Sequence, residues 1–370
     1  MNIVELVLAG DGAMANHVSA LASQLRLRGH DVVVAADQNV LDAHEMGESI
    51  TVPGRLSGTQ IRLIKRLVRN CDVVHAHGRN AGLLAATLLT ERHRPAFIIS
   101  WHAPFAGGAA RFAQRSADSL GARMADAVTG TSVDLVAQAR KAGAKRAWVA
   151  EVPSPHLPEL LATTRPTASE REALRTELFA TLPRAAAPGA QPDPRLPMVL
   201  TVGSLIPRKN ILACLDAARE LRGEITWVVI GRGEVSIDDQ LRLGALASRA
   251  PLVLAGERGD VSRWLHAAEA FALTSVWEAS PLALQEAMAA QVPVVATRTG
   301  GIPDLLGPAG RLVEVDDNRG LAQEIRQILD DPQAAEELGR AGRTQIASRP
   351  DLAEVAAAWE ETYLELIESR

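Results

Sequence analysis

The chain has 370 residues, of which 47% are hydrophobic and 22% charged, a composition typical of a folded globular protein with two or three domains. Its net charge of -5 argues against attraction of the whole protein to nucleic acid or to an anionic membrane. Six Trp, five Phe and one Tyr are too few for a surface that stacks bases or sugars on aromatic rings. Two isolated cysteines and an N-terminus without signal-peptide features favour a reduced, cytoplasmic protein.

The first half alternates short apolar runs with stretches of helical spacing. Strands are predicted at residues 3–9, 32–35, 72–75, 97–100, 127–129 and 148–152. Several of these runs are apolar throughout, as expected for strands buried on both faces of a parallel sheet. A basic helical stretch around residues 61–69 is predicted to be a solvated face over a core stripe, with contact to a membrane as the less favoured alternative.

A proline-rich segment, residues 165–197, is predicted to link two domains. Beyond it the alternation resumes, with strands predicted at residues 198–202, 226–230, 252–255, 270–274, 292–297 and 311–315. The pattern predicts two doubly wound α/β domains, residues 1–164 and 198–351, with a last helix at about 352–370 returning to the first domain. Ligands of such sheets bind beyond the carboxyl ends of the strands, so the cleft between the domains is the expected active site.

The strongest motif follows the predicted strand at 270–274, where Glu278 and Glu286 flank Ser280-Pro281. A helix that starts around Pro281 leaves Glu278 in the loop and places Glu286 on the second helical turn. The free N–H groups of a helix N-terminus suit phosphate, whereas two carboxylates suit the hydroxyls of a sugar. The motif therefore predicts hydrogen bonds to a sugar beside an anion site, with a solvated surface helix as the alternative.

Two further loops can bind anions. Arg208 and Lys209 follow Gly203-Ser204 at a predicted helix start, which indicates an anion site or, alternatively, a basic helix cap without a ligand. Gly10, Gly12 and Ala15 form an incomplete dinucleotide fingerprint, and Asp37 follows at roughly the distance of a ribose-binding acid. An NAD-dependent dehydrogenase therefore stays open as an alternative.

The histidines allow two interpretations. His102 follows a predicted strand and faces the expected cleft, either as a site residue or as a structural histidine with satisfied hydrogen bonds. His75 and His77 resemble a metal-binding pair, but a third ligand is not evident and no metal is expected. The sequence also has no D-x-D triplet of the kind that holds a divalent cation on a nucleotide diphosphate.

These residues together resemble the GT-B retaining glycosyltransferases of family four, over nearly the whole chain. Glu278 to Glu286 matches the E-x7-E element of that family, and Gly203 to Lys209 and Gly300 to Asp304 fit as well. The resemblance implies two Rossmann-like domains facing a central cleft. It also implies a hexosyltransferase that moves a sugar, with retention, from a nucleoside-diphosphate sugar to a small-molecule or lipid-linked acceptor, without a metal or other cofactor.

The resemblance also implies a role for individual residues. Glu286 would hold the ribose hydroxyls, Glu278 the donor sugar, and Arg208 and Lys209 the diphosphate, while His102 would sit beside the reacting sugar. The remaining donor-side residues would lie near the phosphates, the sugar and the base: Gly12, Gly203, Ser204, Gly231, Arg258, Ala279, Ser280, Pro281 and Leu282. The acceptor side is expected near His17, Arg55, Arg79 and Trp101.

Two departures from the family pattern affect the donor site. Ser204 stands where the family often has Arg, and Ala279 replaces a common Gly beside the sugar. An active transferase is still expected, because both glutamates and the lysine are present. A nucleotide-sugar epimerase of the same fold and a catalytically silent sugar-nucleotide binder remain as alternatives. The sequence leaves the sugar, the acceptor and the choice between uridine and guanosine open.

Overall fold

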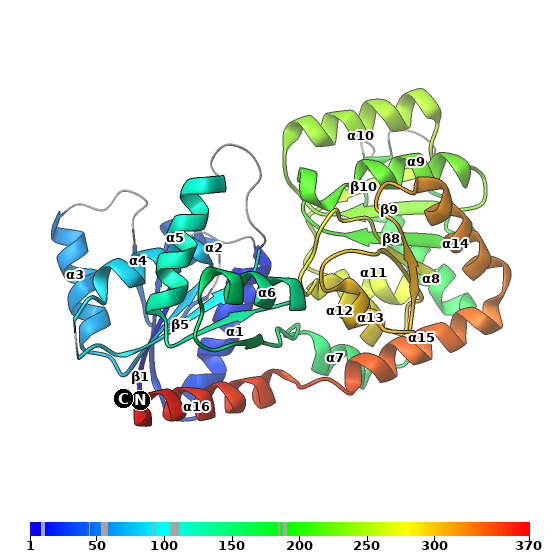
Figure 1. Cartoon of the computed structure of the whole chain (residues 1–370). Helices are drawn as coiled ribbons and strands as arrows, with labels where there is room; N and C mark the ends of the chain where they lie inside the picture. Colours follow the sequence, from blue (N-terminus) through cyan, green and yellow to red (C-terminus); the bar gives the residue numbers. More distant parts are fainter. Residues whose placement is uncertain are drawn as a thin grey trace. The chain divides into compact units, whose positions relative to one another are not determined.

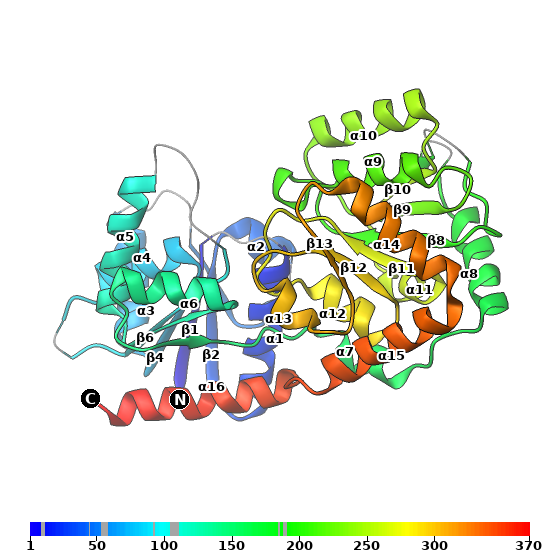
Figure 2. The ribbon, with the colours of Figure 1, turned by 45° about the vertical axis from the view of Figure 1, so that its right-hand side comes forward.

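A computed structural model describes residues 1–8, 12–43, 45–52, 58–91, 93–103, 111–183, 186–187 and 191–370. The chain divides into two compact units (Figures 1 and 2). Unit 1 comprises Met1–Pro155 and Pro350–Arg370, and unit 2 comprises His156–Arg349. Each unit is built around one parallel β-sheet, so the predicted α/β class with two Rossmann-like domains is confirmed.

The sheet of unit 1 has the strand order β3-β2-β1-β4-β5-β6-β7. Its strands are β1 (Asn2–Val7), β2 (Asp31–Ala36), β3 (Ser49–Thr51), β4 (Val73–His77), β5 (Ala96–Trp101), β6 (Ala127–Gly130) and β7 (Ala147–Val149). β3 was not predicted because this short edge strand is mostly exposed and has no apolar run. The other strands match the predicted runs to within a few residues, since burial on both faces required continuous apolar sequence.

Helices cover both faces of the unit 1 sheet. The helices of this unit are α1 (Gly12–Leu27), α2 (Gln38–Ala43), α3 (Gly58–Arg69), α4 (Arg79–Leu88), α5 (Arg111–Met124), α6 (Val133–Ala142) and α16 (Leu352–Glu368). Ile98 on β5 packs into the core beneath α1 and α16. The next residue, Ile99, points to the opposite face, where it contacts Gly82 of α4 and lies close to Gly121 of α5.

The last helix of the chain, α16, belongs to unit 1 and lies against its sheet (Figure 1). A capping box starts it, in which Asp351 accepts from the N–H of Glu354 at 2.8 Å and Glu354 accepts from the N–H of Asp351 at 2.9 Å. Trp359 and Tyr363 lie on its buried face at helical spacing. Two large aromatic side chains therefore anchor a segment that is far from this sheet in the sequence.

Unit 2 has a six-stranded sheet in the order β10-β9-β8-β11-β12-β13. Its strands are β8 (Met198–Val202), β9 (Thr226–Ile230), β10 (Leu252–Gly256), β11 (Ala270–Leu273), β12 (Val294–Thr297) and β13 (Arg311–Val313). Each of these strands lies within or next to a predicted run. The sheet is parallel throughout, so the carboxyl ends of its strands lie along one edge.

Two helical layers enclose this sheet (Figure 2). One layer contains α9 (Leu212–Glu220), α10 (Val235–Ser248) and α14 (Asn318–Asp330). The other contains α7 (Leu157–Ala162), α8 (Ala168–Ala180), α11 (Val261–Ala267), α12 (Leu282–Ala289), α13 (Ile302–Leu306) and α15 (Pro332–Ala347). Successive strand residues such as Val199 and Leu200 pack into opposite layers, as the pleat of a strand requires.

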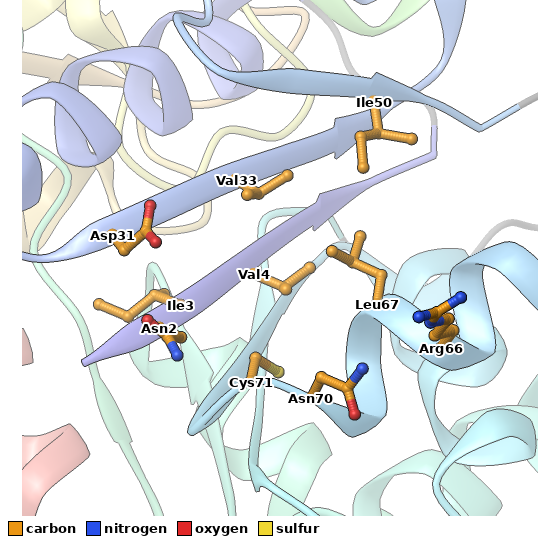
Figure 3. A pocket seen from close by; sticks show the side chains of 10 residues that line it. All are labelled: Asn2, Ile3, Val4, Asp31, Val33, Ile50, Arg66, Leu67, Asn70 and Cys71. Carbon is orange, nitrogen blue, oxygen red and sulfur yellow. The ribbon is translucent and has the colours of Figure 1, made fainter.

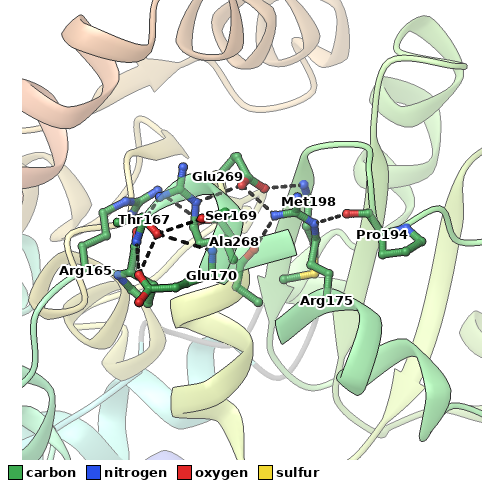
Figure 4. Close-up of polar contacts among 12 residues, drawn as sticks. Arg165, Thr167, Ser169, Glu170, Arg175, Pro194, Met198, Ala268 and Glu269 are labelled. Atoms are coloured by element: carbon green, nitrogen blue, oxygen red, sulfur yellow. Dashed lines mark hydrogen bonds and ion pairs between the residues drawn. The ribbon is translucent and has the colours of Figure 1, made fainter. Parts of the chain in front are cut away.

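The segment predicted as a linker is part of unit 2. The boundary between the units lies at Pro155 and His156, before residues 165–197 begin, and α8 within this segment packs on unit 2. The anchor is Glu269, which precedes β11 and accepts from Arg171 at 3.0 Å, from Arg175 at 2.7 Å and from the N–H of Met198 at 2.7 Å (Figure 4). The prolines predicted the irregular ends of this segment. They gave no indication of the ion pairs that attach α8 to the rest of unit 2.

We predict that Glu269→Ala lowers the free energy of unfolding by about 3 kcal/mol, because it leaves the buried guanidinium of Arg175 without its counter-ion. The control is Glu177→Ala, which removes an exposed ion pair between α8 and Arg263 and should cost less than about 1 kcal/mol. Urea unfolding of the full chain measures both values. Equal losses in the two variants would contradict the anchoring role of Glu269.

Candidate functional site

Most of the predicted donor-side residues lie at the carboxyl edge of the unit 2 sheet, whereas Gly12 lies in unit 1. Gly203 and Ser204 follow β8, Gly231 follows β9, Arg258 follows β10 and Glu278 follows β11. These four strands are neighbours in the order β10-β9-β8-β11. Residues separated in sequence are thus collected along one edge, which is where parallel sheets bind ligands.

Glu278 forms the centre of this edge. Its carboxylate accepts from Arg208 at 2.8 Å, from Lys209 Nζ at 2.6 Å and from the hydroxyl of Ser275 at 2.9 Å. The Glu278 side chain is 8% exposed, that of Lys209 15% and that of Arg208 29%. Burial of a carboxylate is costly without partners, and here two cations compensate the charge of the one acid. The sequence predicted all three as ligand contacts but did not predict that they contact one another.

The backbone also ties these two loops together. The N–H of Val276 donates to the carbonyl of Arg208 at 2.8 Å, and Arg208 Nη1 donates to the carbonyl of Trp277 at 3.1 Å. The hydroxyl of Thr274 donates to the carbonyl of Lys209 at 3.1 Å. The loop after β8 is thus held directly against the loop after β11, which fixes the two cations beside the acid.

A glycine turn fixes the backbone of Glu278. The N–H of Gly301 donates to the carbonyl of Glu278 at 2.8 Å, and Gly300 adopts φ 54°. A Cβ on Gly300 would overlap that same carbonyl oxygen. Only glycine therefore fits this close approach. Gly231 is similar, because a Cβ there would overlap the carbonyl of Gly203.

Helix α12 begins at Leu282 with Pro281 as its N-cap, which confirms the predicted helix start. Ala279 is buried just before it, and the hydroxyl of Ser280 accepts from the side-chain amide of Gln285 at 2.9 Å. Glu286 lies on the buried part of the helix and contacts His156 Nδ1 at 3.0 Å. This hydrogen bond to Glu286 raises the pKa of His156, against the opposing effect of partial burial. The sequence did not predict His156 as a site residue, because His156 and Glu286 are distant in the sequence and only the fold brings them into contact.

Arg258 lies at the same edge. Its Nε donates to the carbonyl of Ala255 at 3.1 Å, and its guanidinium lies 5.6 Å from the ring centroid of Trp264. This cation–π contact holds the guanidinium group near the ring. The role of Arg258 near a base stays a prediction.

In unit 1 a row of polar side chains crosses the interior of the sheet. It consists of Glu5, His75, His77, Ser100 and Thr129, and we call it the polar row. Glu5 pairs in register with His75, His77 with Ser100, and Ser100 with Thr129, so all five face the same side. All five are buried and hydrogen-bonded within this face. An acid in the middle of the apolar first strand was a sequence signal for such a network, because buried charges require partners.

His102 lies next to the polar row, with its Nε2 3.3 Å from Nδ1 of His77. The ring of His17 lies 6.0 Å from that of His102 and 6.1 Å from that of His77. Burial, with a smaller contribution from the neighbouring His77, lowers the pKa of His17 to about 3. His17 Nδ1 is buried without a hydrogen-bond partner in the described part of the chain. The structure thus brings together two site residues that the sequence predicted separately.

Glu5, His75 and His77 also offer ligand atoms that lie within 4.8 Å of one another. A metal ion would have to displace existing hydrogen bonds, because both nitrogens of His75 and both of His77 contact other side chains. Carboxylate and imidazole are ordinary zinc ligands, so these side chains are of the right chemical type for a metal. Here, however, they are hydrogen-bonded to one another and to neighbouring side chains. That the protein needs no metal stays a prediction.

Two of the remaining predicted residues of unit 1, Arg79 and Trp101, lie in contact with each other. Arg79 pairs with Asp118 at 2.7 Å, and its guanidinium stacks 3.8 Å from the ring centroid of Trp101. Trp101 is fully buried, so its ring belongs to the core of unit 1. Gly12 begins α1, and Arg55 lies outside the described residues. The acceptor-side roles of Arg55, Arg79 and Trp101 and the donor-side role of Gly12 stay predictions.

Unit 1 also contains a cavity of about 340 Å³ near the amino ends of β1 and β2 (Figure 3). Asp31, Arg66 and Cys71 line it together with apolar side chains. Burial raises the pKa of Cys71 to about 12, and its thiol donates to the carbonyl of Val68. Among the predicted site residues that the structure describes, none lines this cavity. No helix in the described part of the chain is long and apolar enough to cross a membrane.

Comparison with known families identifies both halves of the chain. Residues 12–155 match the model of the glycosyl transferase 4-like domain, and residues 196–331 match that of glycosyl transferases group 1. Alpha-maltose-1-phosphate synthase of Mycobacterium tuberculosis is 32% identical over 167 residues, which cover 41% of this chain and 43% of the relative. An Escherichia coli UDP-Gal:alpha-D-GlcNAc-diphosphoundecaprenol alpha-1,3-galactosyltransferase is 30% identical over 138 residues, 35% of this chain and 36% of that protein. The chain thus spans less than half the length of these relatives.

Comparison with solved structures identifies the fold. HepE of Anabaena, solved with UDP-glucose, superimposes with a TM-score of 0.82 at 19% identity, over 99% of this chain and 100% of HepE. At this identity the likeness concerns the fold alone, which is that of GT-B glycosyltransferase structures.

We predict that acid destabilises the protein partly through His17. A histidine whose pKa falls on folding contributes stability above its unfolded pKa of 6.5 and loses it as the pH falls toward the folded value of about 3. For His17 this linkage amounts to about 2 kcal/mol between pH 7 and pH 5.

The measurement is chemical denaturation at both pH values for the wild type and for His17→Asn. Between pH 7 and pH 5 the variant is expected to lose about 2 kcal/mol less unfolding free energy than the wild type. Identical pH sensitivity of the two proteins would contradict a buried, neutral His17.

Proposed function

Because the chain belongs to the glycosyl transferases group 1, we propose that it is a retaining hexosyltransferase. It moves a sugar from a nucleoside-diphosphate sugar to a small-molecule or lipid-linked acceptor. The observation that carries this proposal is the contact of Glu278 with Arg208 and Lys209 at the carboxyl edge of the unit 2 sheet. One acid and two cations in one place match the two chemistries of the donor, which are sugar hydroxyls and a diphosphate.

The diphosphate binds to the two cations. In the free protein Glu278 pairs with both Arg208 and Lys209, and an arriving diphosphate takes the place of this carboxylate beside the two cations. The N-terminus of α12 adds backbone N–H groups next to the same loop. The carboxylate of Glu278 then accepts from hydroxyls of the donor sugar. These cations and helix N–H groups stabilise the leaving diphosphate electrostatically, so the proposal includes no metal.

Glu286 binds the ribose hydroxyls in this proposal. Its carboxylate is held on α12 and already accepts one hydrogen bond, from His156. A carboxylate has room for further donors, so a ribose diol can join or replace this histidine. Gly231 and Arg258 follow neighbouring strands and frame the base. HepE was solved with UDP-glucose, which makes UDP-glucose the first donor to test.

The acceptor is proposed to be bound by unit 1. His17 and His102 lie together there, and His102 is assigned to the reacting sugar. The names of the relatives include a maltose phosphate synthase and an enzyme acting on a diphosphoundecaprenol-linked sugar. Both a small and a lipid-linked acceptor are therefore tested.

The donor assignment is tested with Glu286→Ala. A thermal-shift screen of nucleoside diphosphates and their sugars first selects the ligand, because a hundredfold excess over Kd stabilises a protein by about 2.7 kcal/mol. Calorimetry with that ligand is expected to show at least about tenfold weaker binding by the variant, since hydrogen bonds to a charged acceptor are lost.

Two controls accompany this measurement. Glu337→Ala removes an exposed acid on α15 and should leave the affinity unchanged. His156→Asn removes the contact to Glu286 but not the carboxylate, and should not weaken binding. Unchanged affinity of Glu286→Ala would contradict the ribose assignment. Sugar rearrangement with the donor alone would indicate an epimerase instead of a transferase.

A further inference from the structure

We infer that Glu5 and His77 are positioning residues that determine which ring nitrogen of His102 carries a hydrogen. The proposed function places His102 beside the reacting sugar, but it assigns no role to the buried strand residues behind it. Glu5, His77 and His102 form a continuous chain of contacts, of 2.6 Å from Glu5 to His77 and 3.3 Å from His77 to His102. The role of these three contacting residues in the reaction rests on the proposed function. The positions of the hydrogens on their side chains do not depend on it.

The direction of each hydrogen bond follows from the chemistry of its partners. A carboxylate can only accept, so Nε2 of His77 donates to Oε2 of Glu5. A neutral imidazole carries its single hydrogen on one nitrogen, which leaves Nδ1 of His77 as an acceptor. Nε2 of His102 lies next to that Nδ1 and must therefore donate. As a result, Nδ1 of His102 carries the lone pair.

A second chain of hydrogen bonds ends on the same carboxylate and uses its other oxygen. Thr129 donates to Ser100 at 2.7 Å, and Ser100 donates to Nε2 of His75 at 2.7 Å. Nδ1 of His75 donates to the phenol oxygen of Tyr363 at 2.7 Å, and that phenol donates to Oε1 of Glu5 at 3.3 Å. In this assignment every hydroxyl and imidazole hydrogen in the chain has an acceptor. Glu5 is thus the end point of both chains.

The environment favours a neutral His102. Burial lowers its pKa well below the usual value. Its Nδ1 has no hydrogen-bond partner within the described ranges. A neutral ring with the lone pair on Nδ1 accepts a hydrogen bond from a hydroxyl and offers no donor there to a phosphate oxygen. The ligand group that this atom fits is a hydroxyl of the donor sugar or of the acceptor.

The opposite arrangement makes a different prediction. If His77 were an imidazolium ion paired with Glu5, both of its nitrogens would donate. Nε2 of His102 would then accept, and the hydrogen of His102 would lie on Nδ1. The two arrangements therefore give His102 opposite tautomers, which a spectroscopic measurement can distinguish in the ligand-free protein.

The experiment is long-range ¹H–¹⁵N correlation spectroscopy of the full chain labelled with ¹⁵N-histidine. The signals of His102 are identified by their loss in His102→Asn. We expect a hydrogen-bearing Nε2 and an unprotonated Nδ1 at neutral pH. A hydrogen-bearing Nδ1 in the wild type would overturn the inference, whatever the behaviour of any variant.

Glu5→Gln tests whether the carboxylate sets this tautomer. The amide of glutamine can donate to Nε2 of His77, which moves the hydrogen of His77 to Nδ1 and in turn moves that of His102 to its own Nδ1. The variant is expected to show this exchanged tautomer. Tyr363→Phe is the control, because it removes the phenol of the second chain while leaving the contact between Glu5 and His77 in place. An unchanged tautomer in Glu5→Gln, or the same exchange in Tyr363→Phe, would contradict the role of Glu5.

Activity provides the second readout. Glu5→Gln is expected to lower kcat by about tenfold or more, while its affinity for the nucleoside diphosphate, measured by calorimetry, stays that of the wild type because that ligand binds unit 2. Loss of nucleotide affinity in this variant would indicate a general structural defect and overturn the positioning role. If the tautomers are as expected but no donor is turned over by the wild type, the proposed function fails and the hydrogen-bond assignment stands.

Discussion

The proposed donor site depends on one interaction, the contact of a nearly buried carboxylate with two cations. Glu278 comes from the loop after β11, whereas Arg208 and Lys209 come from the loop after β8. A buried charge needs compensation, so this ion-pair cluster fixes where both loops must lie. The neighbouring backbone contacts, from Val276 to Arg208 and from Gly301 to Glu278, follow from that requirement. The same charges that stabilise the free protein are those that a diphosphate and a sugar hydroxyl would use.

The parallel sheet makes this cluster feasible. Because β8 and β11 are adjacent and parallel, their carboxyl ends deliver two distant loops to one edge. Unit 1 uses the same geometry for a different purpose. There the register of β1, β4, β5 and β6 aligns Glu5, His75, Ser100 and Thr129 beneath α16, in a network that ends near His102. In each unit a buried carboxylate, Glu5 or Glu278, thus organises the polar groups around it.

The sequence was informative wherever local pattern determines structure. Continuous apolar runs located the strands, and Pro281 located the start of α12, because burial and backbone preference act over a few residues. The resemblance to the family motifs also identified Glu278 and Lys209 as candidate site residues. The contact between these two residues could not be predicted, nor could the contact of Glu286 with His156, since both join positions that only the folded chain brings together. The attachment of α8 through Glu269 was missed for the same reason, whereas the short strand β3 was missed because it is mostly exposed and has no apolar run.

The most direct test of the account is the affinity of Glu278→Gln for UDP, measured by calorimetry. UDP carries the diphosphate but no donor sugar, so it competes with Glu278 for Arg208 and Lys209 without gaining from the carboxylate. The account predicts that the variant binds UDP about fivefold more tightly, corresponding to roughly 1 kcal/mol, while transfer from the nucleotide sugar slows. Glu314→Gln, which alters an exposed ion pair with Arg298 in the same unit, should leave UDP binding unchanged. Equal or weaker binding of UDP by Glu278→Gln would contradict the claim that these two cations hold the diphosphate.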